Sequence, residues 1–215
     1  MTPLNCKFCD LVVEATTVRR EDIPSFGVIG LMASGKSTHR DRLVERIEAE
    51  FGVPVYKGSF SDKISEIARD LFGMAGKDRR LLQQIGAKMN EIDPAVWAKY
   101  LVRNIKANGR TPFVIDGIRR AEEAEAFRQG FPSGFLIILI RAEEHDRLEA
   151  YSRAYHRYPS AGERGDITEK MVSGITPDIT LDNGYTQESL DANVNGIIDA
   201  IRDGSIRAKY LRHGK

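Results

Sequence analysis

The stretch Gly30-Leu31-Met32-Ala33-Ser34-Gly35-Lys36-Ser37 decides the fold of this chain, because it matches the phosphate-binding pattern G-x-x-x-x-G-K-S. An apolar, strand-like stretch at 26–29 precedes it, and a helical pattern with Leu43 and Ile47 on one face follows it. A glycine-rich turn that matched by chance would not carry this context. The order strand, loop, helix predicts that the loop binds polyphosphate.

The residue types of this loop suit a nucleoside triphosphate. Glycine at 30 and 35 permits a tight turn whose N–H groups face the phosphate oxygens. Lys36 is placed to bridge the β- and γ-phosphates, and the Ser37 hydroxyl to ligate Mg²⁺. We therefore predict that ATP and Mg²⁺ bind here, with Lys36 also catalytic, through Gly30, Ala33, Ser34, Gly35, Lys36, Ser37 and Thr38.

Length and charge indicate one domain without a strong electrostatic partner. The 215 residues divide into an N-terminal arm (1–24), a kinase-like domain (25–203) and a C-terminal tail (204–215). The formal net charge of +1 favours neither nucleic acid nor a membrane as partner. The chain has no signal-like segment and no apolar run near the roughly 20 residues that span a bilayer. We expect a cytoplasmic protein with a small-molecule nucleotide substrate.

Cys6 and Cys9 form a C-x-x-C pair in the arm. A zinc site needs four ligands, so one pair binds zinc only if two chains share the ion in a homodimer. The interpretation that we favour is a free cysteine pair in a loose arm.

Short apolar runs alternate with helical patterns through the rest of the chain. The runs at 26–29, 53–56, 113–116, 135–140 and 178–181 predict five strands. Such alternation is typical of an α/β fold with about five parallel strands and helices on both faces, and the phosphate loop makes it a P-loop fold. Ser61 and Asp62 are predicted N-caps of the helix after the second strand.

Asp116 ends one apolar run, as a Walker B carboxylate that holds Mg²⁺ would. The alternative is a helix or turn cap. Arg119 and Arg120 follow directly and could grip an acceptor phosphate, because arginine binds phosphate in a bidentate fork. Otherwise they begin a solvated helix and pair with Glu122 and Glu123.

Two further sets of residues, one of arginines and one of mixed polar side chains, are candidates for substrate contacts. The arginines around the helix after the longest strand could form a closing lid, and we single out Arg153, together with Arg119, as catalytic. Arg80 and Gln84 could reach a phosphate and a base edge, and Asp62 and Lys63 could shape the acceptor pocket. For both sets the alternative is a helix face exposed to solvent. The lid candidates are Arg141, Arg147, Arg153 and Arg157.

Several segments together resemble the deoxynucleoside monophosphate kinases of bacteriophages. They are the phosphate loop, the run from Arg79 to Gly86, the segment 94–101 with Trp97, the run from Ile115 to Arg119, and the run from Asp178 to Gly184. The Asp116-Gly117-Ile118-Arg119 element is also similar to dephospho-CoA kinase-like proteins of archaea.

The resemblance implies a P-loop kinase fold and Mg²⁺-dependent transfer of the ATP γ-phosphoryl group to a nucleoside 5′-monophosphate. It implies that Arg119 lies near the acceptor phosphate and that Arg80 and Gln84 lie on the acceptor-side helix. The first 24 residues have no counterpart in it.

Two alternatives remain open at this stage. The acceptor could be a hydroxyl, on a coenzyme precursor or a modified base in DNA, with Asp62 or Asp116 as general base. The chain could also be a non-catalytic ATP-binding switch that engages a partner through its cysteine arm.

Overall fold

The structure is a computed structural model that describes residues 18–160 and 172–207. Cys6 and Cys9, and with them the expected zinc site, lie outside the described residues. The elements are η1 (Arg20–Asp22), β1 (Ser25–Ile29), α1 (Lys36–Phe51), β2 (Tyr56–Ser59), α2 (Phe60–Phe72), α3 (Arg79–Ile92), α4 (Val96–Ala107), β3 (Phe113–Asp116), α5 (Ala121–Gly130), β4 (Phe135–Arg141), α6 (Glu144–Tyr155), β5 (Ile179–Asp182) and α9 (Gln187–Arg202).

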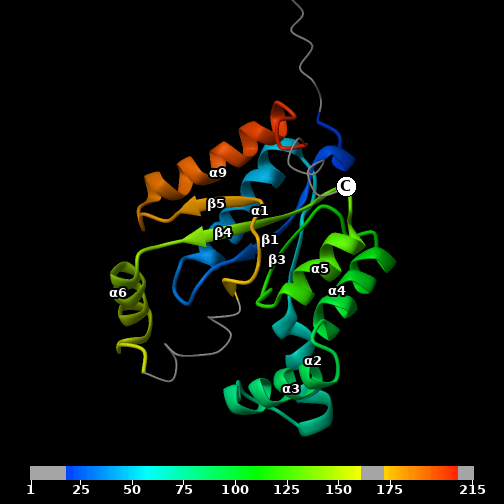
Figure 1. Ribbon diagram of the computed structural model, residues 1–215, viewed down its shortest axis with the longest axis vertical. Coiled ribbons are helices and arrows are strands. Elements are labelled where there is room, and N and C mark those ends of the chain that lie inside the picture. The colour runs from blue at the N-terminus through cyan, green and yellow to red at the C-terminus, as the bar shows by residue number, and fades with distance from the viewer. Residues whose placement is uncertain (1–17, 161–171, 208–215) are drawn as a thin grey trace, which may run out of the picture.

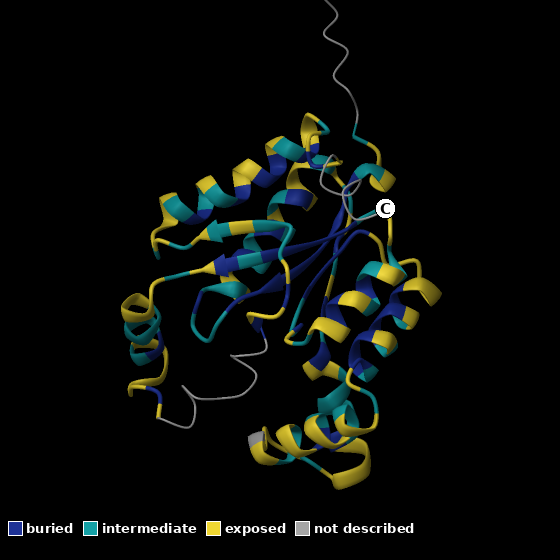
Figure 2. Cartoon of the chain, in the orientation of Figure 1, coloured by how far each residue is buried: buried dark blue, intermediate teal, exposed yellow. Residues whose placement is uncertain are grey.

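The five strands form one sheet in the order β2-β3-β1-β4-β5, and every pairing is parallel (Figure 1). This confirms the predicted α/β fold. All five residues of β1 are buried, since the central strand is covered on both faces. The buried strands stand out against the more exposed helices in Figure 2.

Two helix layers cover the sheet. Helices α1 and α9 pack on one face through Leu43, Ile47 and Ile198, against strand residues such as Val28. Helices α4 and α5 pack on the other face, where Trp97 joins Phe127 and the aromatic side chains of β3 and β4. Burial of large apolar side chains on both faces is the main stabilising contribution to such a fold.

The carboxyl ends of the strands meet at one edge. Asp116, the last residue of β3, is in register with Val28 of β1 and with Ser59 of β2. The phosphate loop begins directly after β1 at this edge. In Figure 1, α6 lies beyond the ends of β4 and β5, whereas α2 and α3 form a pair at the bottom of the molecule.

The second strand begins three residues later than the sequence predicts. It runs from Tyr56 to Ser59, not over 53–56. Proline at 54 has no N–H for a ladder, and the N–H of Val55 donates to the Glu48 carboxylate at 2.9 Å. Pairing therefore begins only at Tyr56, whose N–H donates to Pro112 O at 3.0 Å.

The start of α2 also differs from the expectation. Ser59, not Ser61 or Asp62, is the N-cap, because its Oγ accepts from the Ser61 N–H at 3.3 Å. The Asp62 carboxylate accepts in return from the Ser59 N–H at 3.2 Å, which completes a capping box. Further along α2, Leu71 points outward with 75% of its surface exposed, although its spacing predicts burial. This end of α2 lies beyond the sheet (Figure 1).

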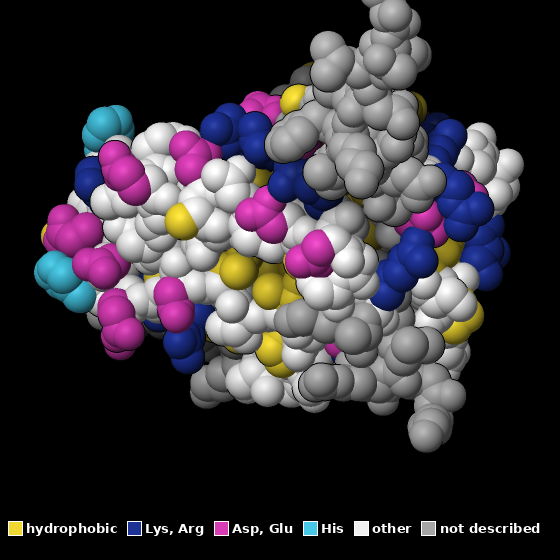
Figure 3. All heavy atoms as spheres, turned by 90° about the horizontal axis from the view of Figure 1, so that it is seen from above, with side chains coloured by type: hydrophobic (Ala, Val, Ile, Leu, Met, Phe, Trp, Pro, Cys, Tyr) yellow, Lys and Arg dark blue, Asp and Glu magenta, His cyan; other side chains and the backbone are white. Residues whose placement is uncertain are grey.

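The surface carries charges of both signs. In Figure 3, acidic and basic side chains share the described part of the face that α9 covers. Ile206, in the expected tail, is buried beside α9, and its N–H donates to Ala200 O at 3.0 Å. Within 18–160 and 172–207, no helix combines the length and the apolar character that a bilayer crossing requires.

Candidate functional site

The phosphate loop has a backbone that only glycine tolerates at two points. Gly30 has φ +153°, and a Cβ there would lie 2.5 Å from Ile140 O and 2.6 Å from Ser34 Oγ. Gly35, the N-cap of α1, has φ +86°. Ala33 also adopts the left-handed region, at φ +59°, where a side chain costs energy. The loop leads straight into the N-terminus of α1, whose dipole favours an anion.

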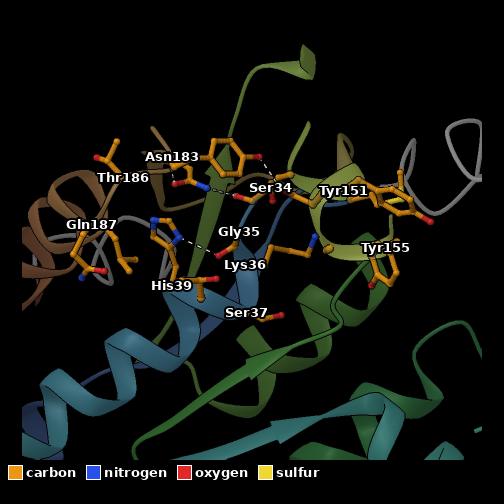
Figure 4. A pocket seen from close by; sticks show the side chains of 17 residues that line it. Ser34, Gly35, Lys36, Ser37, His39, Tyr151, Tyr155, Asn183, Thr186 and Gln187 are labelled. Carbon is orange, nitrogen blue, oxygen red and sulfur yellow. Dashed lines mark hydrogen bonds between the residues drawn. The ribbon is translucent and has the colours of Figure 1, made fainter. Parts of the chain in front are cut away.

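A cavity of about 630 Å³ lies along this loop, and we call it the larger cavity. Its volume is in the usual range for small-molecule sites. Figure 4 shows Tyr151 and Tyr155 of α6 on one side of the loop and Thr186 and Gln187 on the other. The two tyrosine rings lie 4.5 Å apart between centroids, and Tyr151 is buried. The predicted ATP-binding residues 33–38 all line this cavity, whereas Gly30 does not.

A smaller cavity, of about 360 Å³, lies on the other side of the loop. It is lined by Gly30, Asp116 and Arg119, and it shares Lys36 and Ser37 with the larger cavity. Its apolar wall consists of Val28, Phe60, Ile64, Ile118 and Val172. Lys36 Nζ donates to Leu31 O at 2.5 Å, which keeps the amine at the loop.

The two predicted magnesium ligands line the same smaller cavity. Ser37 supplies a hydroxyl and Asp116 a carboxylate, and oxygen ligands of this kind suit Mg²⁺. Asp116 forms an ion pair with Arg40 of α1, and both side chains are largely buried. Among the described residues, no group of three or more His, Cys, Asp or Glu side chains forms a ready metal site. Magnesium binding by this pair therefore stays a prediction.

Other predicted substrate residues lie away from the loop. Asp62 and Lys63 line a separate cavity of about 350 Å³ between α2 and α4, and Lys63 pairs with Glu66 at 2.5 Å. Arg80 and Gln84 are exposed on α3 and line neither of the two cavities at the loop. The two adjacent arginines differ in position. Arg119 lines the smaller cavity, whereas Arg120 does not line it and is the N-cap of α5.

The four lid arginines differ in whether they contact the phosphate loop, which the sequence does not show. Arg153, singled out as catalytic, is exposed on α6. Arg147 instead reaches the loop, because its Nη1 donates to Met32 O at 3.3 Å. Arg141 pairs with Asp182 at 2.5 Å, and the Arg157 guanidinium lies 5.5 Å from the Tyr151 ring centroid.

Three residues at the site were not predicted. Asn183 Nδ2 donates to Ser34 O at 3.0 Å, and the Tyr185 hydroxyl donates to Ala33 O at 2.7 Å. His39 Nδ1 lies 3.0 Å from Gly35 O. Asn183 and Tyr185 belong to the polar turn after β5, so a rule that searches the carboxyl ends of all strands would have found them.

His39 is buried and polar groups face both its ring nitrogens. Since a carbonyl only accepts, Nδ1 carries the proton toward Gly35 O, and Nε2 accepts from Asn193 Nδ2 at 3.3 Å. Burial lowers the pKa of His39, and the hydrogen bond to Gly35 O opposes this only in part. The neutral imidazole is thus the form that the site favours.

Comparison with known proteins assigns the chain to a family. A family model described as AAA domain matches residues 27–169. The UPF0200 proteins of Methanosarcina mazei and Methanosarcina acetivorans are each 26% identical to the chain, over 79% and 80% of it and 91% of their own length.

Solved kinase structures share the fold. A gluconokinase from Sinorhizobium meliloti 1021 superposes with a TM-score of 0.55 at 13% identity, covering 88% of this chain and 98% of its own. A putative kinase from Chloroflexus aurantiacus gives a TM-score of 0.51 at 19% identity, covering 84% and 97%. These structures confirm the P-loop kinase fold.

Proposed function

The chain belongs to the AAA domain family, and on that premise we propose that it is an ATP-dependent phosphotransferase. We infer further that it transfers the ATP γ-phosphoryl group to an organic monophosphate, most simply a nucleoside or deoxynucleoside 5′-monophosphate. The fold shared with kinases and the complete phosphate loop support the first step. The choice of a monophosphate as the acceptor depends on the smaller cavity.

One observation carries the proposal: two cavities meet at Lys36 and Ser37. A nucleotide in the larger cavity, with its phosphates on the loop, would present its γ-phosphate at these two residues. A second molecule in the smaller cavity would face the same point. In-line transfer requires this arrangement of a donor and an acceptor on either side of the transferred group.

The lining of the smaller cavity favours an acceptor that is anionic at one end and apolar at the other. Arg119 and Lys36 place two cations against the single carboxylate of Asp116, which is itself paired with Arg40. Phe60, Ile64 and the other apolar lining residues can cover a flat organic group such as a base.

The chemistry then needs positioning more than a general base. An acceptor phosphate is already anionic, so one of its oxygens can attack the γ-phosphorus as the bond to the β-bridging oxygen breaks and ADP leaves. Lys36 would neutralise charge on the transferred group, and Arg119 would hold the acceptor. When bound at Ser37 and Asp116, Mg²⁺ would offset charge on the ATP phosphates.

We expect ADP release from ATP and Mg²⁺ to be stimulated by one or a few ribo- or deoxynucleoside monophosphates. Lys36→Ala should lower this rate by about 10²-fold or more, because a preorganised cation at the transferred group is lost. A coupled ADP-release assay over a panel of monophosphates measures both. Lys88→Ala is the matched control, since Lys88 is an exposed lysine on α3 that pairs with Glu91.

Other outcomes of this assay would overturn parts of the proposal. Transfer to alcohols and to no monophosphate would favour the hydroxyl acceptor, with Asp116 as base because it lines the smaller cavity. Tight ATP binding without transfer to any acceptor would favour a nucleotide-binding switch. Full activity in Lys36→Ala would contradict the phosphate-loop mechanism itself.

A further inference from the structure

Four consecutive carbonyl groups of the phosphate loop accept hydrogen bonds from side chains. Met32 O accepts from Arg147, Ala33 O from Tyr185, Ser34 O from Asn183, and Gly35 O from His39. The donors come from α6, from the turn after β5 and from α1. We call these four donors the carbonyl clamp; Figure 4 shows the contacts that Asn183 and His39 make.

The clamp determines which way the loop amides face. In a trans peptide unit the C=O of one residue and the N–H of the next point in opposite directions. Asn183 anchors Ser34 O, whereas Gly35 O is held both by the His39 ring and by the His39 N–H, which donates to it at 3.0 Å. The N–H groups of Gly35 and Lys36 therefore point away from Asn183 and His39. The Ser34 N–H is engaged within the loop, where it donates to Leu31 O at 3.2 Å. The Gly35 and Lys36 amides, which follow the two anchored carbonyls, are candidates to bind an anion.

The turn that supplies Asn183 and Tyr185 is itself held in place. Asn183 Oδ1 accepts from the Tyr185 N–H at 3.0 Å, and the Asn183 N–H donates to Arg141 O at 2.8 Å. Asn193 of α9 donates to Asp182 O at 2.9 Å. The turn is thus fixed to both β4 and α9.

One donor of the clamp, Tyr185, and the residue whose carbonyl it contacts, Ala33, both have unfavourable backbone conformations. Tyr185 has φ +55° and Ala33 has φ +59°, and the Tyr185 hydroxyl donates to Ala33 O. A side chain in the left-handed region persists only where surrounding contacts enforce it. Here the two unfavourable residues are joined by a hydrogen bond of 2.7 Å, so each helps to hold the other.

We propose that Asn183 and Tyr185 are positioning residues that hold the phosphate loop in its anion-binding form before the nucleotide arrives. The inference rests on the proposed function only in taking a nucleoside triphosphate as the ligand of the loop. Their hydrogen bonds go to the loop backbone, so their contribution to binding concerns the phosphates of the ligand, not its nucleoside. A preorganised loop binds more tightly because it does not have to be ordered on binding.

The test compares two ligands that share phosphates but not a base. We expect Tyr185→Phe and Asn183→Ala each to raise the Kd of ATP by about three- to tenfold, the size expected for one hydrogen bond. The Kd of inorganic tripolyphosphate should rise by the same factor. Calorimetry on the full chain without any acceptor measures both values, and chemical denaturation checks that the variants remain folded.

The matched controls remove a tyrosine hydroxyl and an asparagine amide that lie away from the phosphate loop. Tyr158→Phe removes a hydroxyl that donates to Glu149 at 2.5 Å, and Asn108→Ala removes an amide that donates to Asn104 O at 2.8 Å. Neither residue lines the two cavities at the loop, so both variants should bind ATP and tripolyphosphate as the wild type does.

The outcomes separate this inference from the proposed function. Unchanged Kd values in both Tyr185→Phe and Asn183→Ala would overturn the positioning role. A loss confined to ATP, with tripolyphosphate unaffected, would also overturn it, because these side chains would then contact the nucleoside. Weaker binding of both ligands in a protein that transfers phosphate to no acceptor would support the positioning role and overturn only the proposed reaction.

Discussion

His39 links the phosphate loop to α9 through a neutral ring. Its Nδ1 proton goes to Gly35 O and its Nε2 accepts from Asn193, so a second ring proton would meet an amide N–H₂ group. The burial that lowers its pKa makes protonation less favourable in the folded chain than in the unfolded chain. The unfolded state therefore takes up this proton first as the pH falls.

We expect His39 to make stability depend on pH. Its contribution to the free energy of unfolding is complete above the ordinary histidine pKa of about 6.5 and declines as the pH falls below it. Urea denaturation at pH 7.5, 6.0 and 5.0 should show a steeper loss in the wild type than in His39→Asn. His145→Asn, which replaces an exposed histidine of α6, should keep the wild-type slope. Parallel curves for wild type and His39→Asn would contradict this reasoning.

At the residue scale the sequence predicted the local part of the site. The loop from Gly30 to Ser37 is contiguous, so its pattern alone indicated what it binds. Asn183 and Tyr185 contact it from 149 and 152 residues away, so no local pattern encodes these contacts. Only the rule that the carboxyl ends of parallel strands meet at one edge points to the turn that holds them. Arg147 was in the predicted arginine set, but only the structure separates it from Arg153.

Among the elements, the turn between β3 and α5 depends on one buried carboxylate. Glu123 Oε2 accepts from the N–H groups of Arg119 and Arg120, at 2.8 and 3.1 Å. Burial raises the pKa of Glu123, although these two backbone hydrogen bonds oppose the rise. The turn carries Arg119 into the lining of the smaller cavity.

Glu123→Ala should lower the free energy of unfolding by about 1–3 kcal/mol, because two backbone donors lose their acceptor. It should also raise the KM of the acceptor, since Arg119 is no longer held. Glu122→Ala is the matched control: Glu122 is exposed in the same first turn, so both variants lose the same helix-dipole interaction. Denaturation and steady-state kinetics measure the two effects. Equal behaviour of the two variants would show that the turn does not need Glu123.

Element boundaries were less predictable than element types. The second strand shifted to Tyr56–Ser59 because its first ladder bond goes to Pro112 O, a partner that lies far along the chain. The N-cap of α2 is Ser59, two residues before Ser61 and three before Asp62, which were the predicted N-caps. The shift of the strand accounts for this difference, because Ser59 is also the last residue of β2. The spacing of Leu71 in α2 predicted burial, but this end of the helix extends beyond the sheet, so Leu71 stays exposed.

At the scale of the whole molecule, alternation of strands and helices was enough to predict a parallel sheet with two helix layers. Parallel strands need crossovers, and right-handed crossovers place the helices on the two faces. The division of the sheet edge into two cavities was not predictable in this way. It depends on where α2 and α6 come to lie relative to the loop, and side-chain packing decides that.

A single compound that fills both cavities should bind more tightly than either substrate. We expect a nucleoside monophosphate joined through its phosphate to the γ-phosphate of ATP to bind about 10²-fold more tightly than ATP alone. Calorimetry with the joined compound, with ATP and with an equimolar mixture of the separate substrates makes the comparison. An affinity equal to that of ATP would mean that the smaller cavity does not receive the attached group.

Lys36 and Ser37 belong to the lining of both cavities, and this shared wall has a thermodynamic consequence. Two separate molecules that meet there each give up their translational and rotational freedom. A joined molecule gives up that freedom once, and its second half is then present at the high effective concentration that a short tether imposes. The shared wall therefore brings two reactants together, and it equally makes the protein vulnerable to a ligand in which they are already bound to each other.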